Sequence, residues 1–361
     1  MSAATRVRSV EARPWRVPLS EPFAIAGGTA HALDSVLVRL TLADGTTGWG
    51  EASPLPAFNG ETAAKSLRQI RAASRDWTGR DAAAWRPLLE ELEARLPKDG
   101  GAARAALGMA LLDAWTRRAG MPLAAFFGGA ERRVVSDVTV TIVGPEAADA
   151  AARRIKALGV RTIKIKVGED PDADAARVRA VHAAAPRMRL TLDANQGYGP
   201  RESLALMRRL RRAGVPVALF EQPAHADDWD GLAEVARKAR VPVAADESLR
   251  GRKDALALAR RGGVAVLNLK LMKMGLLEAW DCALIAKSAG LGLMIGGMVE
   301  TPLAMGCAAH LAAGLGGFSF VDLDTPLWLA RIPTRGLTFG RGGAYDLGTV
   351  KAGIGVVPRA D

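Results

Sequence analysis

Five short segments in the middle of the chain decide its fold. They read TIKIKVG (162–168), RLTLDANQ (189–196), ALFEQP (218–223), VAADES (243–248) and VLNLK (266–270). Each contains a run of aliphatic residues, and helix-like amphipathic sequences separate one run from the next, so we predict a β-strand in each. Further runs end at Thr141, Gly296 and Asp322, which gives eight strand ends spaced 24 to 28 residues apart.

This regular spacing predicts a parallel (β/α) barrel. A strand, a loop, a crossover helix and a second loop fill that length, and eight such units close a barrel. In this fold the loops at the carboxyl ends of all the strands meet at one mouth, where the chemistry takes place. The polar residues that end the runs should therefore face one another across a single pocket.

The sequences on either side of the barrel predict further units. Residues 1–130 do not follow the barrel period, and SVLVRLTLADGTTGWGEA (35–52) alternates as a β-hairpin does, with helix-like stretches after it. No helical run follows Asp322, so we expect the barrel to lack its eighth helix. The predicted class is α/β, with an α+β capping domain (1–130), a (β/α)7β modified TIM barrel (131–325) and a tail (326–361) that returns to the capping domain.

The composition excludes several classes of protein. The 361 residues are 49% hydrophobic and 24% charged, which is typical of a globular protein. Two cysteines, Cys282 and Cys307, are too few for a disulfide framework, and the N-terminus lacks the apolar segment of a secretory signal, so we expect a cytoplasmic protein. The nearly uncharged stretch Thr301–Val321 could span a bilayer by length, but its Gly-rich turn and its place in the barrel period favour a barrel helix over a membrane segment.

The formal net charge of +11 raises the alternative of a nucleic-acid partner. The basic residues are mostly arginines spread along predicted helices, as at Arg208, Arg209, Arg211 and Arg212, with few aromatic residues among them. This pattern favours the solvated outer faces of barrel helices. We therefore expect a small-molecule substrate and no nucleic-acid partner.

Three acids at successive strand ends, Asp193, Glu221 and Asp246, predict a metal site. Hard cations such as Mg²⁺ prefer oxygen ligands and keep open positions for substrate oxygens. One such acid alone is more often a salt-bridge partner, but buried carboxylates in three neighbouring units must be paired or ligated. Zinc is disfavoured because His31, His182, His225 and His310 show no metal-ligand spacing.

Lysines lie at the strand ends on both sides of these acids. Lys164 and Lys166 are two residues apart on one strand and share a face, and Lys270 ends the strand after Asp246. Buried ammonium groups beside a cation oppose further positive charge, so we expect a lowered pKa in one of the first two lysines. Bases on both faces of a carbon, with a metal holding the adjacent carboxylate as an enediolate, predict racemisation or epimerisation.

Asp322 and Asp324 form the last acidic pair, again at strand spacing. Two acids on this side of the mouth could bind a cationic ammonium group of the substrate. The alternative is that they only balance the charge of the lysines.

Six motifs together resemble one known family. They are KIKVG (164–168), LDANQGY (192–198), FEQP (220–223), ADES (245–248), LNLK (267–270) and GGMVET (296–301). Over almost the whole chain they resemble the muconate cycloisomerase subgroup of the enolase superfamily, whose members combine an α+β capping domain with a (β/α)7β barrel. The segment DLDTP (322–326) is similar to the DxD motif of dipeptide epimerases, in which two acids hold the α-ammonium group of the dipeptide.

The resemblance implies a role for each residue. Asp193, Glu221 and Asp246 would bind one Mg²⁺ per subunit, with Asn195, Glu247 and Asn268 supporting these ligands. Lys166 and Lys270 would be the acid/base pair. The substrate would be held by Lys164, Asp322, Asp324, Gly28, Thr141 and Met298.

One departure from the family concerns substrate choice. Two capping-domain segments, Phe23–Leu33 and Ser53–Thr62, have the composition of exposed loops. Family members that act on Ala-Glu carry an arginine in the first loop, whereas FAIAGGTAHAL contains no Arg or Lys. We therefore expect the second residue of the dipeptide not to be acidic.

The resulting hypothesis is a Mg²⁺-dependent epimerase that inverts the α-carbon of the C-terminal residue of an L-Ala-L-Xaa-type dipeptide by two-base (Lys/Lys) 1,1-proton transfer through an enediolate. Alternatives within the subgroup are an o-succinylbenzoate synthase, an N-acylamino acid racemase and a cycloisomerase. A Schiff-base lysine aldolase is an alternative of another class. The identity of Xaa, the pathway and a homo-oligomeric state stay open.

Overall fold

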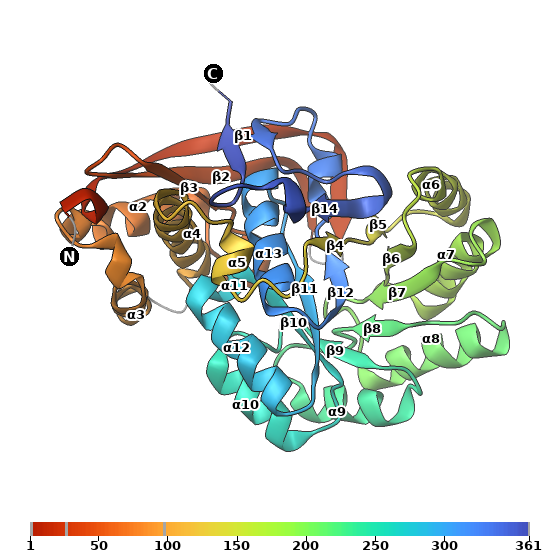
Figure 1. Cartoon of the computed structure of the whole chain (residues 1–361). Helices are drawn as coiled ribbons and strands as arrows, with labels where there is room; N and C mark the ends of the chain where they lie inside the picture. Colours follow the sequence, from red (N-terminus) through yellow and green to blue (C-terminus); the bar gives the residue numbers. More distant parts are fainter. Residues whose placement is uncertain (1–2, 26–27, 97–98, 360–361) are drawn as a thin grey trace.

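The computed structural model describes residues 3–25, 28–96 and 99–359. A sheet of eight parallel strands forms the barrel, and its strands lie in chain order (Figure 1). They are β5 (Val138–Val140), β6 (Thr162–Lys166), β7 (Arg189–Asp193), β8 (Leu219–Glu221), β9 (Val243–Ala245), β10 (Val266–Lys270), β11 (Gly292–Gly296) and β12 (Phe318–Asp322). The Asp137 N–H donates to Val321 O at 2.8 Å and links the first strand to the last.

The predicted barrel is confirmed almost to the residue. Six strands end where the sequence predicted, and β5 and β9 end one residue before Thr141 and Asp246. The crossover helices are α6 (Pro145–Ala157), α7 (Pro171–Ala184), α8 (Pro200–Arg212), α9 (Trp229–Lys238), α10 (Arg252–Arg261), α12 (Leu276–Ser288) and α13 (Pro302–Leu315). A single extra turn, α11 (Leu271–Met274), follows β10 directly and was not predicted.

The N-terminal unit contains an antiparallel sheet of β1 (Val7–Ile25), β2 (Gly28–Leu42) and β3 (Thr47–Ala52). The hairpin of β2 and β3 was predicted, but β1 was not. The helices of this unit are α1 (Pro56–Asn59), α2 (Ala63–Ala73), α3 (Trp85–Arg95), α4 (Gly101–Arg118) and α5 (Leu123–Phe126). Helix α4 packs so closely on β3 that a Cβ at Gly50 would overlap the carbonyl of Ala106.

The predicted loop Phe23–Leu33 is wrong as a loop. Apart from residues 26 and 27, which lie outside the described residues, the segment is strand, with Phe23 paired with Ala30 and Ile25 paired with Gly28. Its small residues have weak β-propensity, but backbone pairing between the two long strands overrides this local preference. The segment therefore extends the β1–β2 ribbon.

The tail after β12 holds short strands and 3-10 turns, and no α-helix lies within residues 323–359. Its strands are β13 (Thr334–Gly336), β14 (Ala344–Asp346) and β15 (Val356–Pro358), and β14 pairs with β4 (Arg133–Val135). Several hydrogen bonds tie it to the N-terminal unit; among them, Leu123 N–H donates to Gly353 O at 2.8 Å, and Ile354 N–H donates to Asp113 Oδ1 at 2.7 Å. The domain boundaries at 130 and 325 stay predictions.

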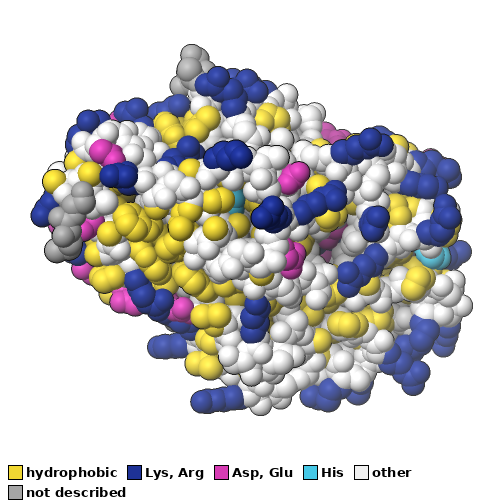
Figure 2. All heavy atoms as spheres, viewed as in Figure 1, with side chains coloured by type: hydrophobic (Ala, Val, Ile, Leu, Met, Phe, Trp, Pro, Cys, Tyr) yellow, Lys and Arg dark blue, Asp and Glu magenta, His cyan; other side chains and the backbone are white. Residues whose placement is uncertain are grey.

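The outer surface carries the excess positive charge. Figure 2 shows Lys and Arg side chains spread over the face drawn, with Asp and Glu side chains between some of them. Several arginines pair with acids on the same helix, as Arg153 does with Asp149 at 2.7 Å. No helix in the described part of the chain is both long and apolar enough to cross a bilayer, and the stretch that raised this alternative forms the buried helix α13 and most of β12.

His310 on α13 joins the barrel to the N-terminal unit and the tail. Its Nδ1 accepts the Ala124 N–H at 2.9 Å, and its Nε2 lies 2.9 Å from Ile354 O, to which it donates in the neutral tautomer. The ring is fully buried, and burial lowers the pKa of His310 to about 4. At neutral pH the folded chain therefore contains His310 in its uncharged form.

We expect this histidine to destabilise the fold in mild acid. The unfolded chain binds a proton near pH 6.5, whereas the folded chain does so only near pH 4, so stability falls as the pH drops through this window. The difference between these two pKa values corresponds to about 3 kcal/mol of folding free energy. Thermal unfolding of the wild type and His310→Gln between pH 7 and pH 4 tests it, and equal pH slopes in the two proteins would contradict the prediction.

Candidate active site

A cavity of about 830 Å³ lies where the barrel mouth meets the N-terminal unit. On the barrel side it is lined by Lys166, Asn195, Gln196, Asp246, Glu247, Lys270, Asp322 and Asp324. The segment after β3 closes the other side with Pro54, Leu55 and Phe58. The structure thus brings four of the predicted strand-end residues, Lys166, Asp246, Lys270 and Asp322, to one pocket, and the predicted functional segment Ser53–Thr62 contributes a wall. Asp193 and Glu221 are buried and are not part of the described cavity lining.

Lys164 lies beneath the floor of this cavity. Its Nζ is 2.9 Å from Asp193 Oδ2, 2.8 Å from Glu221 Oε2 and 2.6 Å from Asp322 Oδ2, and the residue is only 1% exposed. Burial acts to lower the pKa of Lys164, but these carboxylates outweigh it and raise the pKa well above its usual value. The expected lowering of the pKa is therefore wrong for Lys164, because so many acids converge on it.

Lys166 and Lys270 reach the cavity from opposite sides of the barrel, since β6 and β10 are four strands apart in a ring of eight. Lys166 Nζ donates to Asp193 Oδ2 at 2.6 Å and to Asn195 Oδ1 at 3.0 Å. Lys270 Nζ lies 2.7 Å from Asp246 Oδ2. Burial acts to lower the pKa of Lys270, but Asp246 and the neighbouring acids raise it overall. Two ammonium groups thus face one space.

The acids of the site do not all ionise easily. Burial and the nearby carboxylate of Asp193 raise the pKa of Glu221 to about 7. Burial and Asp246 raise the pKa of Glu247 to about 8. The buried acids outnumber the buried lysines at this end of the barrel, so the site carries an excess of carboxyl groups that a cation would relieve.

The donor set fits a hard divalent cation. Asp193, Glu221 and Asp246 offer carboxylate oxygens, and two further oxygens, Asn268 Oδ1 and Glu247 Oε2, are buried with no hydrogen-bond partner among the described residues. In the conformation described, ammonium groups bind the three acids, and no three acidic, His or Cys side chains of residues 3–25, 28–96 and 99–359 converge as a ready ligand cluster. Their role as ligands stays a prediction.

Asp322 and Asp324 both line the cavity. Asp322 binds Lys164, which is the charge-balancing contact that the sequence left open. Asp324 follows β12 and accepts the Thr139 N–H through Oδ2 at 2.7 Å, while its Oδ1 is buried and has no hydrogen-bond partner in the described chain. Burial and the nearby Asp322 raise the pKa of Asp324 to about 6. A cationic partner would satisfy this carboxylate.

The remaining predicted residues are placed less uniformly. Met298 lines the cavity, as expected. Thr141 does not belong to the described lining, because β5 ends at Val140, one residue before it. Thr139, which lies on β5, lines the cavity instead. Gly28 begins β2, pairs with Ile25 and is not part of the described cavity lining. Asn195 Nδ2 donates to Glu247 Oε1 at 3.3 Å, and Asn268 Nδ2 donates to Glu221 Oε1 at 2.6 Å.

Gln222 is a residue whose part in the site the sequence did not reveal. Its Oε1 accepts the N–H groups of Asp246 and Ser248 at 2.8 and 3.1 Å, and its Nε2 donates to Ser248 Oγ at 2.8 Å. It therefore fixes the backbone that carries Asp246. Its place directly after Glu221 was the only signal available, since a buried glutamine has no pattern of its own.

Comparisons with known proteins agree with this architecture. Residues 7–128 match the family described as mandelate racemase / muconate lactonizing enzyme, N-terminal domain, and residues 146–361 match the family described as enolase C-terminal domain-like. The chain is 45% identical to the aromatic dipeptide epimerase of Herpetosiphon aurantiacus, over 98% of this chain and 99% of that protein. It is 33% identical to the L-Ala-D/L-Glu epimerase of Bacillus subtilis, over 98% of each.

A solved structure of a relative has a similar fold. The dipeptide epimerase of Enterococcus faecalis, complexed with Mg and the dipeptide L-Leu-L-Tyr, superimposes with a TM-score of 0.93 at 33% identity, covering 97% of this chain and 99% of that one. The chain belongs to the enolase superfamily, among the mandelate racemase and muconate lactonizing enzymes, as its motifs predicted.

Proposed function

We propose that this chain is a Mg²⁺-dependent dipeptide epimerase that inverts the α-carbon of the C-terminal residue of an L-Ala-L-Xaa-type dipeptide. The observation that carries the proposal is the pair Lys166 and Lys270, which face one cavity from opposite sides beside Asp193 and Asp246. Relatives that are named dipeptide epimerases, and the Mg and dipeptide complex of one of them, support it.

The two lysines would move the proton. With the α-carbon between them, one neutral lysine takes the α-proton and leaves the electron pair on the substrate as an enediolate. The opposite lysine, as an ammonium group, returns a proton to the other face of the carbon. One C–H bond is broken and one is formed, so the bonds balance and the centre inverts. Proton exchange of the two lysines with solvent then restores their starting protonation states.

The acids would hold the charges of the substrate and cofactor. Asp193, Glu221 and Asp246 would bind Mg²⁺, which supplies Lewis-acid stabilisation of the substrate carboxylate when bound. Lys164, held among the acids of the floor, adds positive charge on the same side. Asp324, with its unpartnered Oδ1, and Asp322 would bind the α-ammonium group of the dipeptide.

An apolar wall would receive the Xaa side chain. Leu55, Phe58 and Met298 line the cavity away from the charged floor. Arg16 also lines the cavity, and its Nε lies 3.1 Å from Asp34 Oδ1, whose negative charge partly offsets its own. This supports an apolar or small Xaa over an acidic one.

Deuterium exchange tests the proposal directly. A library of L,L-dipeptides is incubated with the protein and Mg²⁺ in D2O, and mass spectrometry and chiral separation follow the α-carbon. We expect deuterium at the C-terminal α-carbon together with formation of the L,D-epimer, with the best turnover for apolar Xaa. Absence of exchange across the whole library would reject the proposal.

Freeing Arg16 should shift specificity toward acidic dipeptides. In Asp34→Asn the guanidinium loses its partner and can attract a glutamate side chain. The pair is solvent-exposed, so we expect kcat/KM for L-Ala-L-Glu relative to L-Ala-L-Leu to rise only about twofold to fivefold. The double variant Arg16→Met/Asp34→Asn is the control and should lose this gain; retention of the gain would contradict the role of Arg16.

A further inference from the structure

A fourth buried lysine lies just outside the cavity. Lys273 belongs to the single turn α11, its side chain is 0% exposed, and it is not part of the described cavity lining. Its Nζ donates to Asp246 Oδ1 at 2.6 Å, to Asp246 O at 2.6 Å and to Asn268 O at 3.0 Å. Because an ammonium group has three N–H donors, all of them are used, and Lys273 has none left for a substrate.

These bonds divide the carboxylate of Asp246 between two lysines. Oδ1 is bound by Lys273, whereas Oδ2 is bound by Lys270, which reaches the cavity. The bond to Asn268 O also fixes the backbone of the residue whose Nδ2 binds Glu221. One side chain thus orients two of the three acids that would hold the cation.

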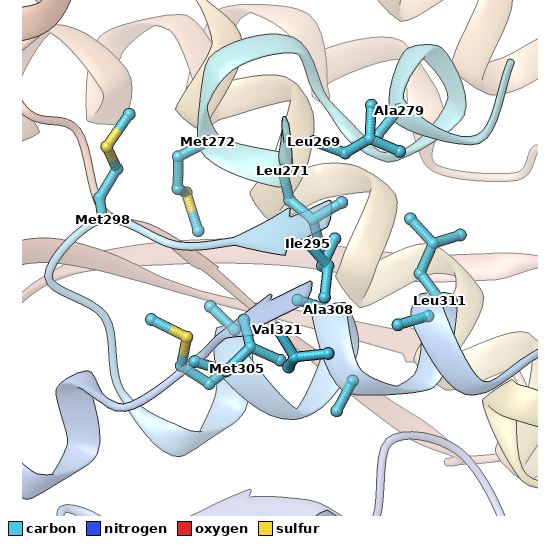
Figure 3. Packing of buried hydrophobic residues seen from close by; sticks show 14 of the residues in the cluster. Leu269, Leu271, Met272, Ala279, Ile295, Met298, Met305, Ala308, Leu311 and Val321 are labelled. Carbon is cyan, nitrogen blue, oxygen red and sulfur yellow. The ribbon is translucent and has the colours of Figure 1, made fainter. Parts of the chain in front are cut away.

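Helix α4 of the N-terminal unit fixes the position of Lys273. A Cβ at Gly101 would overlap the carbonyl oxygens of Met272 and Lys273, so α4 lies directly against the backbone of α11. Arg104 Nε donates to Met274 O at 3.1 Å, and Gly275 ends the turn with a φ of 88°. On its other side, α11 is anchored in the core, where Leu271 lies beside Ile295 of β11 and both belong to the same cluster of buried residues (Figure 3).

We infer that Lys273 is a positioning residue that presets Asp246 for cation binding, and that α4 holds it there through α11. The inference rests on the proposed function, because Asp246 is a ligand only in that proposal. The direction in which cation affinity changes when Lys273 is replaced distinguishes a positioning role from a simple effect of its charge. Loss of a positive charge beside Asp246 would by itself tighten cation binding, whereas loss of positioning weakens it.

Mn²⁺ is the probe, and its free concentration is read by electron paramagnetic resonance without any assay of activity. Lys273→Met keeps the packing volume, and Lys273→Ala leaves room for the missing propylammonium group. We expect both to raise the Kd for Mn²⁺ about 10- to 100-fold. Lys287→Met, which changes an exposed lysine of α12, is the matched control and should leave the Kd unchanged.

Two further arms exclude a merely structural effect. Added n-propylammonium should restore Mn²⁺ binding in Lys273→Ala, and 1-propanol should not. Gly101→Ala changes no side chain of the site, but its Cβ would displace the backbone of α11. It should therefore also raise the Kd for Mn²⁺, and it keeps the inference testable if the Lys273 variants do not fold. An unchanged or tighter Kd in folded Lys273→Met, or in folded Gly101→Ala, would overturn the inference.

The wild type separates this inference from the proposed function. A wild-type chain that binds Mn²⁺ but exchanges no dipeptide α-proton rejects the proposed epimerase and leaves the positioning role to be decided by the Kd values above. A wild-type chain that binds no Mn²⁺ overturns the positioning role as well.

Discussion

Lys166→Met and Lys270→Met should each lose epimerisation by about 10²- to 10⁴-fold, the usual contribution of a positioned acid or base. Their losses should differ in kind, because the lysines face opposite sides of the α-carbon. Each variant retains one lysine. That lysine can still remove and return the α-proton of the one epimer whose α-proton points toward it. We therefore expect one variant to exchange deuterium into the L,L-dipeptide with retention and the other to do so with the L,D-dipeptide.

The measurement is the rate of deuterium uptake and of inversion, determined separately for each epimer by mass spectrometry and chiral chromatography. Lys238→Met is a suitable control, since Lys238 pairs with Glu234 on the exposed face of α9 and lies outside the described cavity lining. Identical exchange patterns in the two lysine variants would contradict the two-base mechanism. Trapping of a substrate on either lysine by borohydride would instead favour the Schiff-base aldolase.

Asp324→Asn should produce the second large effect, and it should depend on the substrate. The amide keeps an oxygen for the Thr139 N–H but removes the charge that the substrate ammonium would meet. Loss of one partner of a buried charge pair costs about 2 to 4 kcal/mol, so kcat/KM for dipeptides should fall roughly 30- to 1000-fold.

Matched substrates provide the control for Asp324→Asn. An N-acetylated dipeptide lacks the ammonium group, so its turnover, already low, should change little. An equal loss for free and acetylated substrates would show that Asp324 acts through the structure of the site. High wild-type turnover of N-acyl substrates would favour the N-acylamino acid racemase alternative.

The sequence predicted the barrel and the site well because both follow from strand ends. A charged residue such as Asp193 or Lys270 that closes an aliphatic run marks the carboxyl end of a strand, and parallel strands place those ends together. Spacing along the chain therefore determined neighbours in space. The capping unit had no such period, and the pairing that turns Phe23–Leu33 into strand depends on β1, whose alternation is interrupted by prolines such as Pro14 and Pro18.

Lys273 escaped prediction for a different reason. In KLMKMG it follows Lys270 by three residues and resembles an ordinary polar position at the start of a helix. A single helical turn is too short to show periodicity. Its inward position depends on tertiary contacts, namely its hydrogen bonds to Asp246 and the close approach of α4 to α11 at Gly101. The lowered pKa expected for a lysine was also misjudged at Lys164, because the number of converging acids depends on tertiary structure.

The tail described above has a consequence for synthesis on the ribosome. Ile354 bonds to Asp113 of α4 through its N–H and to His310 of α13 through its carbonyl, so the joint between the two units needs a residue 241 positions after Asp113. The N-terminal unit emerges before the barrel but cannot complete this contact until residue 354 has been translated. During most of elongation its tail-facing surface stays uncovered, and a chain released early, before residue 354, would be open to chaperones and proteases.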